Sequence, residues 1–270
     1  MFKLKSTALN AREITQINAK YHDTISFFYD TYQEQNHPKV LDLYDSFFKD
    51  IFAYFDRLRK KKLNILDIGC GTGYLEQFMK PEKHKILGID VSRKLLAVAK
   101  TKYPAATFKL QDAYSLKDGS YDLVVENSVL HHLKDYETIL EKMTVLLKPN
   151  GCILLGAEPN YYCYRYFSFL KVFFRNVLPD KRSLKTKEIK NKLEKFAEYH
   201  MYFADGMNPF ELKKFFLKKG FRRVDLRFSS REFFAGIIDR MDLRIVDYIP
   251  NFLLDSTGLL SRLFYLIVYK

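Results

Sequence analysis

Short apolar runs alternate with amphipathic stretches through the middle of the chain. The runs are typical of buried strands and are five to seven residues long, mostly rich in Ile, Leu and Val, at residues 64–68, 85–90, 106–110, 121–126 and 151–157. Between them, apolar residues recur at three- and four-residue steps over 92–102 and 136–147, which predicts helices. Strands that alternate with helices predict an α/β fold, a parallel sheet with helices on both faces.

The flanks of this region have a different pattern. Residues 8–60 have helical spacing, residues 160–207 lack a strand signal, and a helix ending at Gly220 precedes an apolar strand at 221–228. Residues 231–262 read as a further helical stretch before a final strand at 263–269. We therefore expect one domain over 1–270, divided as follows: a helical cap (1–60), a ligand-binding core (61–158), a helical insertion (159–207) and a C-terminal part of the sheet (208–270) with a helical insertion (231–262).

A glycine-rich turn follows the first of these strands. Residues 66–73 read Leu-Asp-Ile-Gly-Cys-Gly-Thr-Gly and lie where a strand passes into a helix. Glycine has no Cβ, so the backbone of such a turn can approach a ligand closely. The motif alone is weak evidence, because glycine turns also occur for structural reasons.

Polar side chains at the ends of the next strands make the interpretation specific. Asp90 ends the second strand, Asp112 and Ala113 follow the third, and Glu126 and Asn127 end the fourth. In an open α/β sheet, the carboxyl ends of the strands form the ligand-binding edge, and an acidic residue placed like Asp90 can accept hydrogen bonds from both ribose hydroxyls. We therefore predict a nucleoside site at this edge rather than a set of unrelated helix caps.

This series of motifs resembles class I S-adenosylmethionine-dependent methyltransferases, particularly the small-molecule enzymes that include the ubiquinone and menaquinone methyltransferases. The resemblance covers about residues 60–158. It implies a Rossmann-like, doubly wound, seven-stranded sheet in the order 3-2-1-4-5-7-6, with the last strand antiparallel and helical lid insertions. It implies S-adenosylmethionine as cofactor, held by Asp67 at the amino group, Asp90 at the ribose and Asp112 at the adenine. The full expected binding set is Asp67, Gly69, Cys70, Gly71, Gly73, Asp90, Val91, Asp112, Ala113 and Asn127.

A nicotinamide-binding Rossmann domain is the main alternative. Its usual pattern is GxGxxG, whereas Gly69, Gly71 and Gly73 give GxGxG after the acidic Asp67. An acidic residue there suits a cationic amino acid moiety better than a pyrophosphate.

Two histidines after the fourth strand are the candidates for catalysis. Methyl transfer from a sulfonium needs mainly alignment, and a general base helps when the acceptor is a hydroxyl or an acidic carbon. His131 or His132 could be that base, since histidine titrates near neutrality, or both could only pack against the sheet. We expect no metal. Tyr21, His22 and Tyr29 are candidates for a lid over the cofactor.

The expected acceptor is a small, hydrophobic or lipid-linked molecule, methylated on oxygen or carbon. The fourth strand ends in Glu126-Asn-Ser-Val, without the Asn/Asp-Pro-Pro-Tyr tetrad of adenine-amino methyltransferases, and a Pro-Cys cytosine nucleophile is also absent. These absences argue against DNA methylation. The alternatives are an RNA or protein methyltransferase that uses a basic surface, and a non-catalytic binding module with the same fold.

Charge and aromatic residues concentrate in the helical insertion. The net charge is +13, and residues 160–230 hold 17 Lys and Arg against 7 Asp and Glu. Residues 161–178 are rich in Tyr and Phe with interspersed Arg and Lys, which predicts an acceptor lid, or an interfacial helix on an anionic membrane, or a helix packed on the core. The three cysteines form no CxxC pair, and we expect a cytoplasmic protein, peripheral at the membrane if the second interpretation holds.

Overall fold

A seven-stranded sheet forms the centre of the molecule. The computed structural model describes residues 9–26, 38–117, 119–166, 196–229 and 261–270. The strands are β1 (Asn64–Ile68), β2 (Lys85–Asp90), β3 (Thr107–Leu110), β4 (Tyr121–Asn127), β5 (Leu147–Pro159), β6 (Arg223–Ser229) and β7 (Leu263–Tyr269). Their order is β3-β2-β1-β4-β5-β7-β6, with β7 antiparallel to both of its neighbours. The predicted fold class, strand order and antiparallel last strand are confirmed.

Helices cover both faces of this sheet. One face packs against α5 (Tyr136–Leu146) and α10 (Pro209–Lys218), and the other against α2 (Pro38–Arg57) and the short α3 (Glu76–Met79). The helix α4 (Arg93–Lys102) packs beside β2 and β3. Alternating residues of β1 divide between the two cores: Ile65 joins the α2 side, and Leu66 and Ile68 join the α5 side. The parallel strands β1, β2, β4 and β5 are therefore largely buried on both faces, as their apolar runs predicted, whereas the edge strand β3 buries only Phe108.

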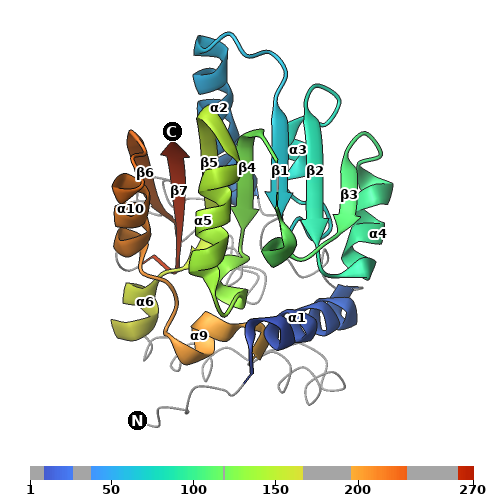
Figure 1. The fold of residues 1–270 in the computed structure, drawn as a ribbon, viewed down its shortest axis with the longest axis vertical. Helices are drawn as coiled ribbons and strands as arrows, with labels where there is room; N and C mark the ends of the chain where they lie inside the picture. Colours follow the sequence, from blue (N-terminus) through green and yellow to red (C-terminus); the bar gives the residue numbers. More distant parts are fainter. Residues whose placement is uncertain (1–8, 27–37, 118, 167–195, 230–260) are drawn as a thin grey trace.

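Two helices cross the edge where the parallel strands end (Figure 1). They are α1 (Ala11–Ile25) and α9 (Tyr199–Phe203), and both contact the 3₁₀ turn η4 (Leu130–His132). The capping box of Asn10 and Glu13 begins α1. At its other end, the carboxylate of Asp23 accepts hydrogen bonds from the Ser92 hydroxyl and the Lys94 backbone N–H, at 2.5 and 3.1 Å. These contacts hold α1 over the ligand-binding edge.

The structure differs from the expected elements in detail. β5 begins at Leu147, four residues earlier than predicted, and a register irregularity against β4 accommodates the additional residues. The two predicted helical insertions lie partly outside the described residues. The described part of the first insertion (159–207) includes the helices α6 (Tyr161–Tyr166) and α9. Residues 231–260 of the second insertion lie outside the described residues.

Candidate active site

The glycine loop after β1 is folded tightly against its neighbours. Gly69 has a φ of +70°, and a Cβ at this position would lie 2.3 Å from a methyl carbon of Val129. The backbone N–H groups of Gly69 and Cys70 donate to the Ile89 carbonyl at 2.8 and 3.0 Å, which ties the loop to β2. Only glycine combines this backbone conformation with so close an approach.

Asp90 is fixed at the end of β2 by backbone donors. One of its carboxylate oxygens accepts from the Gly71 N–H at 2.9 Å, and the other accepts from the Ser92 N–H at 2.7 Å. The residue is only 8% exposed. Each carboxylate oxygen has a further lone pair, so the side chain can still accept from a ligand diol. This geometry agrees with the predicted ribose site.

Three buried carboxyl groups gather around the glycine loop. Burial, together with the neighbouring Glu76 and Asp90, raises the pKa of Asp67 well above its usual range. Burial raises the pKa of Glu76 to about 8, and neither of its carboxyl oxygens has a hydrogen-bond partner among the described residues. Uncompensated buried carboxylates are costly unless a cation neutralises them. The amino group and sulfonium of S-adenosylmethionine are cations, whereas a pyrophosphate would add to the repulsion.

Two cavities meet at this edge of the sheet. The larger encloses about 650 Å³, including its open mouth, and extends from β2 and β3 to η4 and α1; the smaller, about 360 Å³, lies at the glycine loop. Both are lined by Gly69, Asn127 and Ser128, so they join where β4 ends. The predicted residues that line one or both are Asp67, Gly69, Cys70, Gly71, Asp90, Val91, Asp112, Ala113 and Asn127.

Gly73 is the member of the predicted set that lines neither cavity. It has a φ of +82°, and a Cβ there would lie 2.9 Å from the Tyr103 ring. Its role in the structure is therefore close packing behind the loop. Asn127, which also belongs to the predicted set, is held in place by Tyr44 of α2, whose hydroxyl donates to the Asn127 amide oxygen at 2.8 Å.

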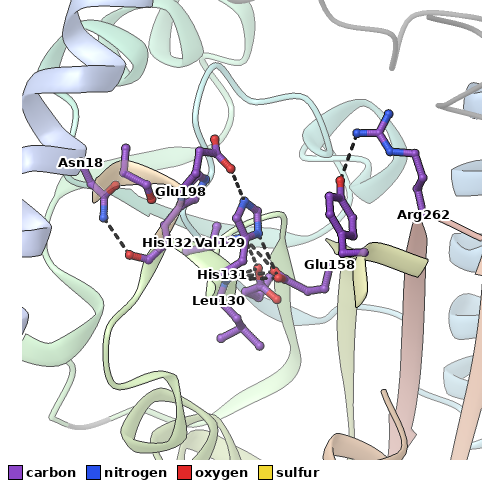
Figure 2. A network of polar contacts seen from close by, with 11 residues as sticks. Asn18, Val129, Leu130, His131, His132, Glu158, Glu198 and Arg262 are labelled. Carbon is purple, nitrogen blue, oxygen red and sulfur yellow. Dashed lines mark hydrogen bonds and ion pairs between the residues drawn. The ribbon is translucent and has the colours of Figure 1, made fainter. Parts of the chain in front are cut away.

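The adjacent histidines of η4 have different environments (Figure 2). Nδ1 of His131 lies 3.0 Å from the Glu158 carboxylate, and Nε2 lies 3.3 Å from the Glu198 carboxylate. Burial alone would lower the pKa of His131, but the charges and hydrogen bonds of these two glutamates raise it to about 10. His131 is therefore an imidazolium near neutral pH and cannot act as a base there.

His132 is held in the opposite protonation state. Its Nδ1 lies 2.7 Å from the Ala197 carbonyl oxygen. Because a carbonyl only accepts, Nδ1 carries the ring proton and Nε2 keeps its lone pair. Burial and the charge of His131 lower the pKa of His132, so the ring is neutral near pH 7. His132 lines the larger cavity, whereas His131 does not.

Helix α1 contributes the neighbouring part of the cavity lining. Asn18 and His22 line it one turn apart, and the Asn18 amide nitrogen donates to the His132 backbone carbonyl at 3.1 Å. The rings of His22 and His132 meet edge to face, with centroids 5.2 Å apart. Burial and His132 lower the pKa of His22 to about 3. We call Asn18, His22 and His132 the acceptor wall; its side chains are polar but uncharged.

Comparison with known proteins decides the family. A family model described as a methyltransferase domain matches residues 66–155. A demethylmenaquinone methyltransferase of Lactococcus lactis is 31% identical over 176 residues, which cover 60% of this chain and 67% of that protein. The chain is a class I S-adenosylmethionine-dependent methyltransferase.

Other relatives agree with this assignment. An uncharacterized methyltransferase of Schizosaccharomyces pombe is 35% identical over 112 residues, which cover 36% of this chain and only 39% of that protein. The plantazolicin methyltransferase BamL, solved with a triazolic desmethylPZN analogue and S-adenosylhomocysteine, shares the fold with a TM-score of 0.57 and 16% identity, over 96% of this chain and 97% of that one. The predicted cofactor of the methyltransferase, S-adenosylmethionine, is confirmed.

Several residues of the methyltransferase site were missed in the sequence. Glu158 ends β5 at the same edge as Asp90 and Glu126, so the rule that found those two could also have found it. Glu76 and Glu198 gave no comparable signal, because each is a single acidic residue in a helical stretch. Of the proposed lid residues, His22 lines the cavity, Tyr21 is buried beside it, and Tyr29 lies outside the described residues.

One cluster within the described residues has the composition of a metal site. His131, His132 and Glu198 each offer one atom within 4.8 Å of the others. At neutral pH, however, the proton on Nε2 of His131 lies beside the Glu198 carboxylate and already compensates that charge. We therefore interpret the cluster as an ion pair, and the absence of a metal remains a prediction.

The proposed membrane contact also remains a prediction. Most of the aromatic and basic stretch, residues 167–195, lies outside the described residues. At its described margin, Tyr166 of α6 is 62% exposed and Phe210 of α10 is 45% exposed, and Tyr162 contacts both rings. Among the helices that the structure describes, none has the length and apolar character required to span a bilayer.

Proposed function

We propose that the enzyme methylates an oxygen or an acidic carbon of a small, hydrophobic or lipid-linked acceptor, and that His132 takes the acceptor's proton. The observation that carries this proposal is the neutral His132 ring in the wall of the cofactor cavity. Histidine with an available Nε2 lone pair is a suitable general base at neutral pH.

The composition of the cavity supports a hydrophobic acceptor. Beyond the acceptor wall and the cofactor-binding acids, its lining is mainly aliphatic, from Ile68, Ile89, Val91, Leu95, Val129 and Leu133. Pockets of this kind bind apolar ligands and use a few polar groups to orient them. The Lactococcus lactis relative is named for demethylmenaquinone, a lipid-linked molecule, which agrees with this class of acceptor.

The reaction that fits this geometry has few steps. Bound S-adenosylmethionine supplies an activated methyl group. The proton of the acceptor O–H or C–H moves to Nε2 of His132, and the electron pair left on the acceptor forms the new bond to the methyl carbon. The electron pair of the broken carbon–sulfur bond stays on sulfur. His131 remains protonated between its two glutamates and positions η4, without touching the cavity.

Replacement of the base tests the proposal. We expect His132→Ala to lower turnover about a hundredfold or more, because general base catalysis contributes that much. The affinity for S-adenosylhomocysteine should stay within about twofold. The wild-type rate should be flat above about pH 6.5 and should fall only at a lower pH, since burial and the charge of His131 lower the pKa of His132 from that value.

The assay uses methyl-labelled cofactor and a small-molecule extract of the source cells. His84→Ala is a matched control. His84 lines neither cavity, and its Nδ1 accepts a hydrogen bond from the Leu63 N–H, just before β1 begins. Equal losses of cofactor affinity and turnover in His132→Ala would show that this residue only supports the fold.

A further inference from the structure

Positive charge is concentrated at the edge of the sheet opposite the cofactor cavity. The parallel strands begin at this edge and the helices α2, α4, α5 and α10 end there, at the top of the view in Figure 1. Its segments hold 17 Lys and Arg against 4 Asp and Glu, so the rest of the chain has 28 of each from totals of 45 and 32. The whole net charge of +13 therefore lies at this edge. We call it the basic edge; its segments are residues 56–62, 80–85, 100–106, 117–122, 148–150, 218–223 and 270.

The fold itself uses some of these cations. Those in the last turns of α2, α4 and α10 suit the negative end of a helix dipole. Lys60 and Lys148 pair with the carboxylate of Asp122 at 2.8 and 2.9 Å, and Lys219 pairs with Glu141 at 2.6 Å. Seven others are exposed, and their side chains have no ion pair or hydrogen bond among the described residues: Arg59, Lys61, Lys62, Lys83, Lys85, Lys117 and Arg222. These seven are available to a partner.

Exposed aliphatic side chains lie among the cations. Leu58 is 38% exposed directly after α2, Leu217 is 46% exposed in the last turn of α10, and Val145 is 76% exposed in the last turn of α5. Apolar side chains surrounded by Lys and Arg are typical of surfaces that lie in the headgroup region of an anionic membrane. Sites for single-stranded nucleic acid instead present aromatic rings on which bases stack. The large apolar side chains exposed on the described part of the basic edge are aliphatic.

The kind of cation also favours a lipid surface. Thirteen of the 17 cations are lysines. The lysine ammonium is a point charge on a flexible stem, whereas arginine binds a phosphate in a fixed, two-point geometry. A surface of lysines therefore suits the diffuse field of many lipid phosphates better than one defined phosphate group.

The dimensions of the basic edge allow a membrane contact that leaves the cofactor cavity free. Seven strands spaced about 4.8 Å apart make this edge about 30 Å wide. The five residues of β1 extend about 17 Å from it, and the glycine-loop cavity lies beyond their far end. A bilayer against the basic edge would therefore leave the mouth of the cavity open to water.

We infer that the basic edge docks the enzyme on an anionic lipid surface, with Leu58, Val145 and Leu217 in the headgroup region and the cofactor cavity directed away from the bilayer. This inference goes beyond the proposed function and requires no turnover. It is distinct from the predicted contact through residues 161–178, which begin in α6 at the opposite end of the molecule in Figure 1. The two contacts would orient the enzyme in opposite directions.

Vesicle co-sedimentation of the full chain with bound S-adenosylhomocysteine tests the inference. The vesicles contain phosphatidylcholine alone, or equal parts of phosphatidylcholine and phosphatidylglycerol. Binding to the anionic vesicles should be at least about tenfold tighter at about 0.1 M salt. It should weaken as the salt concentration rises, because salt screens charges beyond about 10 Å.

Neutralisation of four exposed cations locates the contact. The edge variant combines Arg59→Gln, Lys61→Gln, Lys62→Gln and Lys83→Gln, in the adjacent segments before β1 and β2. Each cation close to an anionic membrane strengthens binding roughly fivefold, so the edge variant should bind anionic vesicles at least about a hundredfold more weakly.

The control variant removes the same amount of charge elsewhere. It combines Arg12→Gln, Lys20→Gln, Lys94→Gln and Lys109→Gln, which are exposed positions on α1, α4 and β3. Because these positions are distant from the basic edge, vesicle binding should weaken by at most about threefold. Both variants should bind S-adenosylhomocysteine within about twofold of the wild type, which shows that they are folded.

A single-stranded RNA, added at a phosphate concentration equal to that of the anionic lipid, separates the two classes of polyanion. Most of the protein should stay on the vesicles. Displacement of most of the protein would assign the basic edge to nucleic acid and overturn the inference. The same conclusion would follow from no preference for anionic vesicles, or from a loss in the edge variant no larger than in the control variant.

Discussion

The cofactor edge and the acceptor wall lie in one cavity but are built in different ways. The cofactor edge comes from consecutive loops after β1, β2, β3 and β4, all within residues 67–127. The acceptor wall joins segments that are distant in sequence: Asn18 bonds to His132 across 114 residues, and His132 bonds to Ala197 across 65. We predict that the local loops hold the cofactor, whereas the acceptor wall depends on tertiary packing of α1, η4 and the residues before α9.

The cofactor edge and the acceptor wall also differ in the charges of their buried groups. At the cofactor edge, Asp67, Glu76 and Asp90 form a buried acidic group, in which burial raises the pKa of each carboxyl. Behind the acceptor wall, the imidazolium of His131 lies between the carboxylates of Glu158 and Glu198. One region therefore favours a cationic ligand, whereas the other presents neutral polar side chains to the cavity. This difference predicts how the two regions respond to substitution.

The largest effect is expected on stability, from His131→Ala. The pKa of His131 is raised to about 10 in the folded protein, so its contribution is fully present below about pH 6.5 and is lost as the pH rises through 10. Removal of the imidazolium leaves buried carboxylates unpaired, which costs about 3–5 kcal/mol at pH 7. The melting temperature should fall by roughly 10 °C.

The neighbouring position is the control for that experiment. His132→Ala removes a buried neutral ring and leaves no charge unpaired, so its loss of melting temperature should be clearly smaller. Equal losses in the two variants, measured by calorimetry at pH 7, would contradict the division into a charged support and a neutral base.

The next effect is on cofactor affinity. Asp90→Ala should weaken S-adenosylhomocysteine binding at least tenfold, since charge-assisted hydrogen bonds to the ribose contribute about 1.5–3 kcal/mol. Asp122→Asn is a matched control at the opposite edge of the sheet, where Lys60 and Lys148 pair with Asp122. It should lower stability and leave affinity unchanged; a tenfold loss in both variants would remove the specific role of Asp90.

The smallest effect is a pH-dependent stabilisation by Glu76→Gln. The pKa of Glu76 is raised from 4.5 to about 8 in the folded protein. Glu76 therefore does not destabilise the fold below about pH 4.5, where it is protonated in both states. The free energy of unfolding of the wild type declines as the pH rises from there to about 8. Near pH 8.5 the cofactor-free variant should exceed the wild type by at least about 1 kcal/mol, or 2–4 °C, and near pH 5 by much less.

Two control measurements apply to Glu76→Gln: the same variant with bound cofactor, and a charge removal at an exposed position. Saturating S-adenosylmethionine should reduce the difference at high pH, because its charges compensate the acidic group. Glu82→Gln removes a charge from an exposed position and should change little at any pH. A stabilisation that is independent of pH would indicate a packing effect rather than a buried charge.

The sequence predicted the sheet and the cofactor edge because both have local patterns. Strand runs, glycine spacing and acids at strand ends follow from short-range geometry. The strand order is therefore as expected, and nine of the ten residues predicted to bind the cofactor line the two cavities. It could not separate His131 from His132, since their protonation states depend on Glu158, Glu198 and Ala197. For the same reason Asn18 gave no signal, because its hydrogen-bond partner among the described residues is a backbone carbonyl of a distant turn.

The most direct test of this account is the destination of a labelled methyl group. An extract of the source cells is treated with the protein and methyl-labelled S-adenosylmethionine, and its protein, nucleic acid and organic-soluble fractions are analysed by mass spectrometry. We expect a labelled, organic-soluble molecule whose formation is strongly reduced with His132→Ala and unchanged with His84→Ala. Label confined to protein or RNA, or an organic product that forms equally without His132, would contradict it.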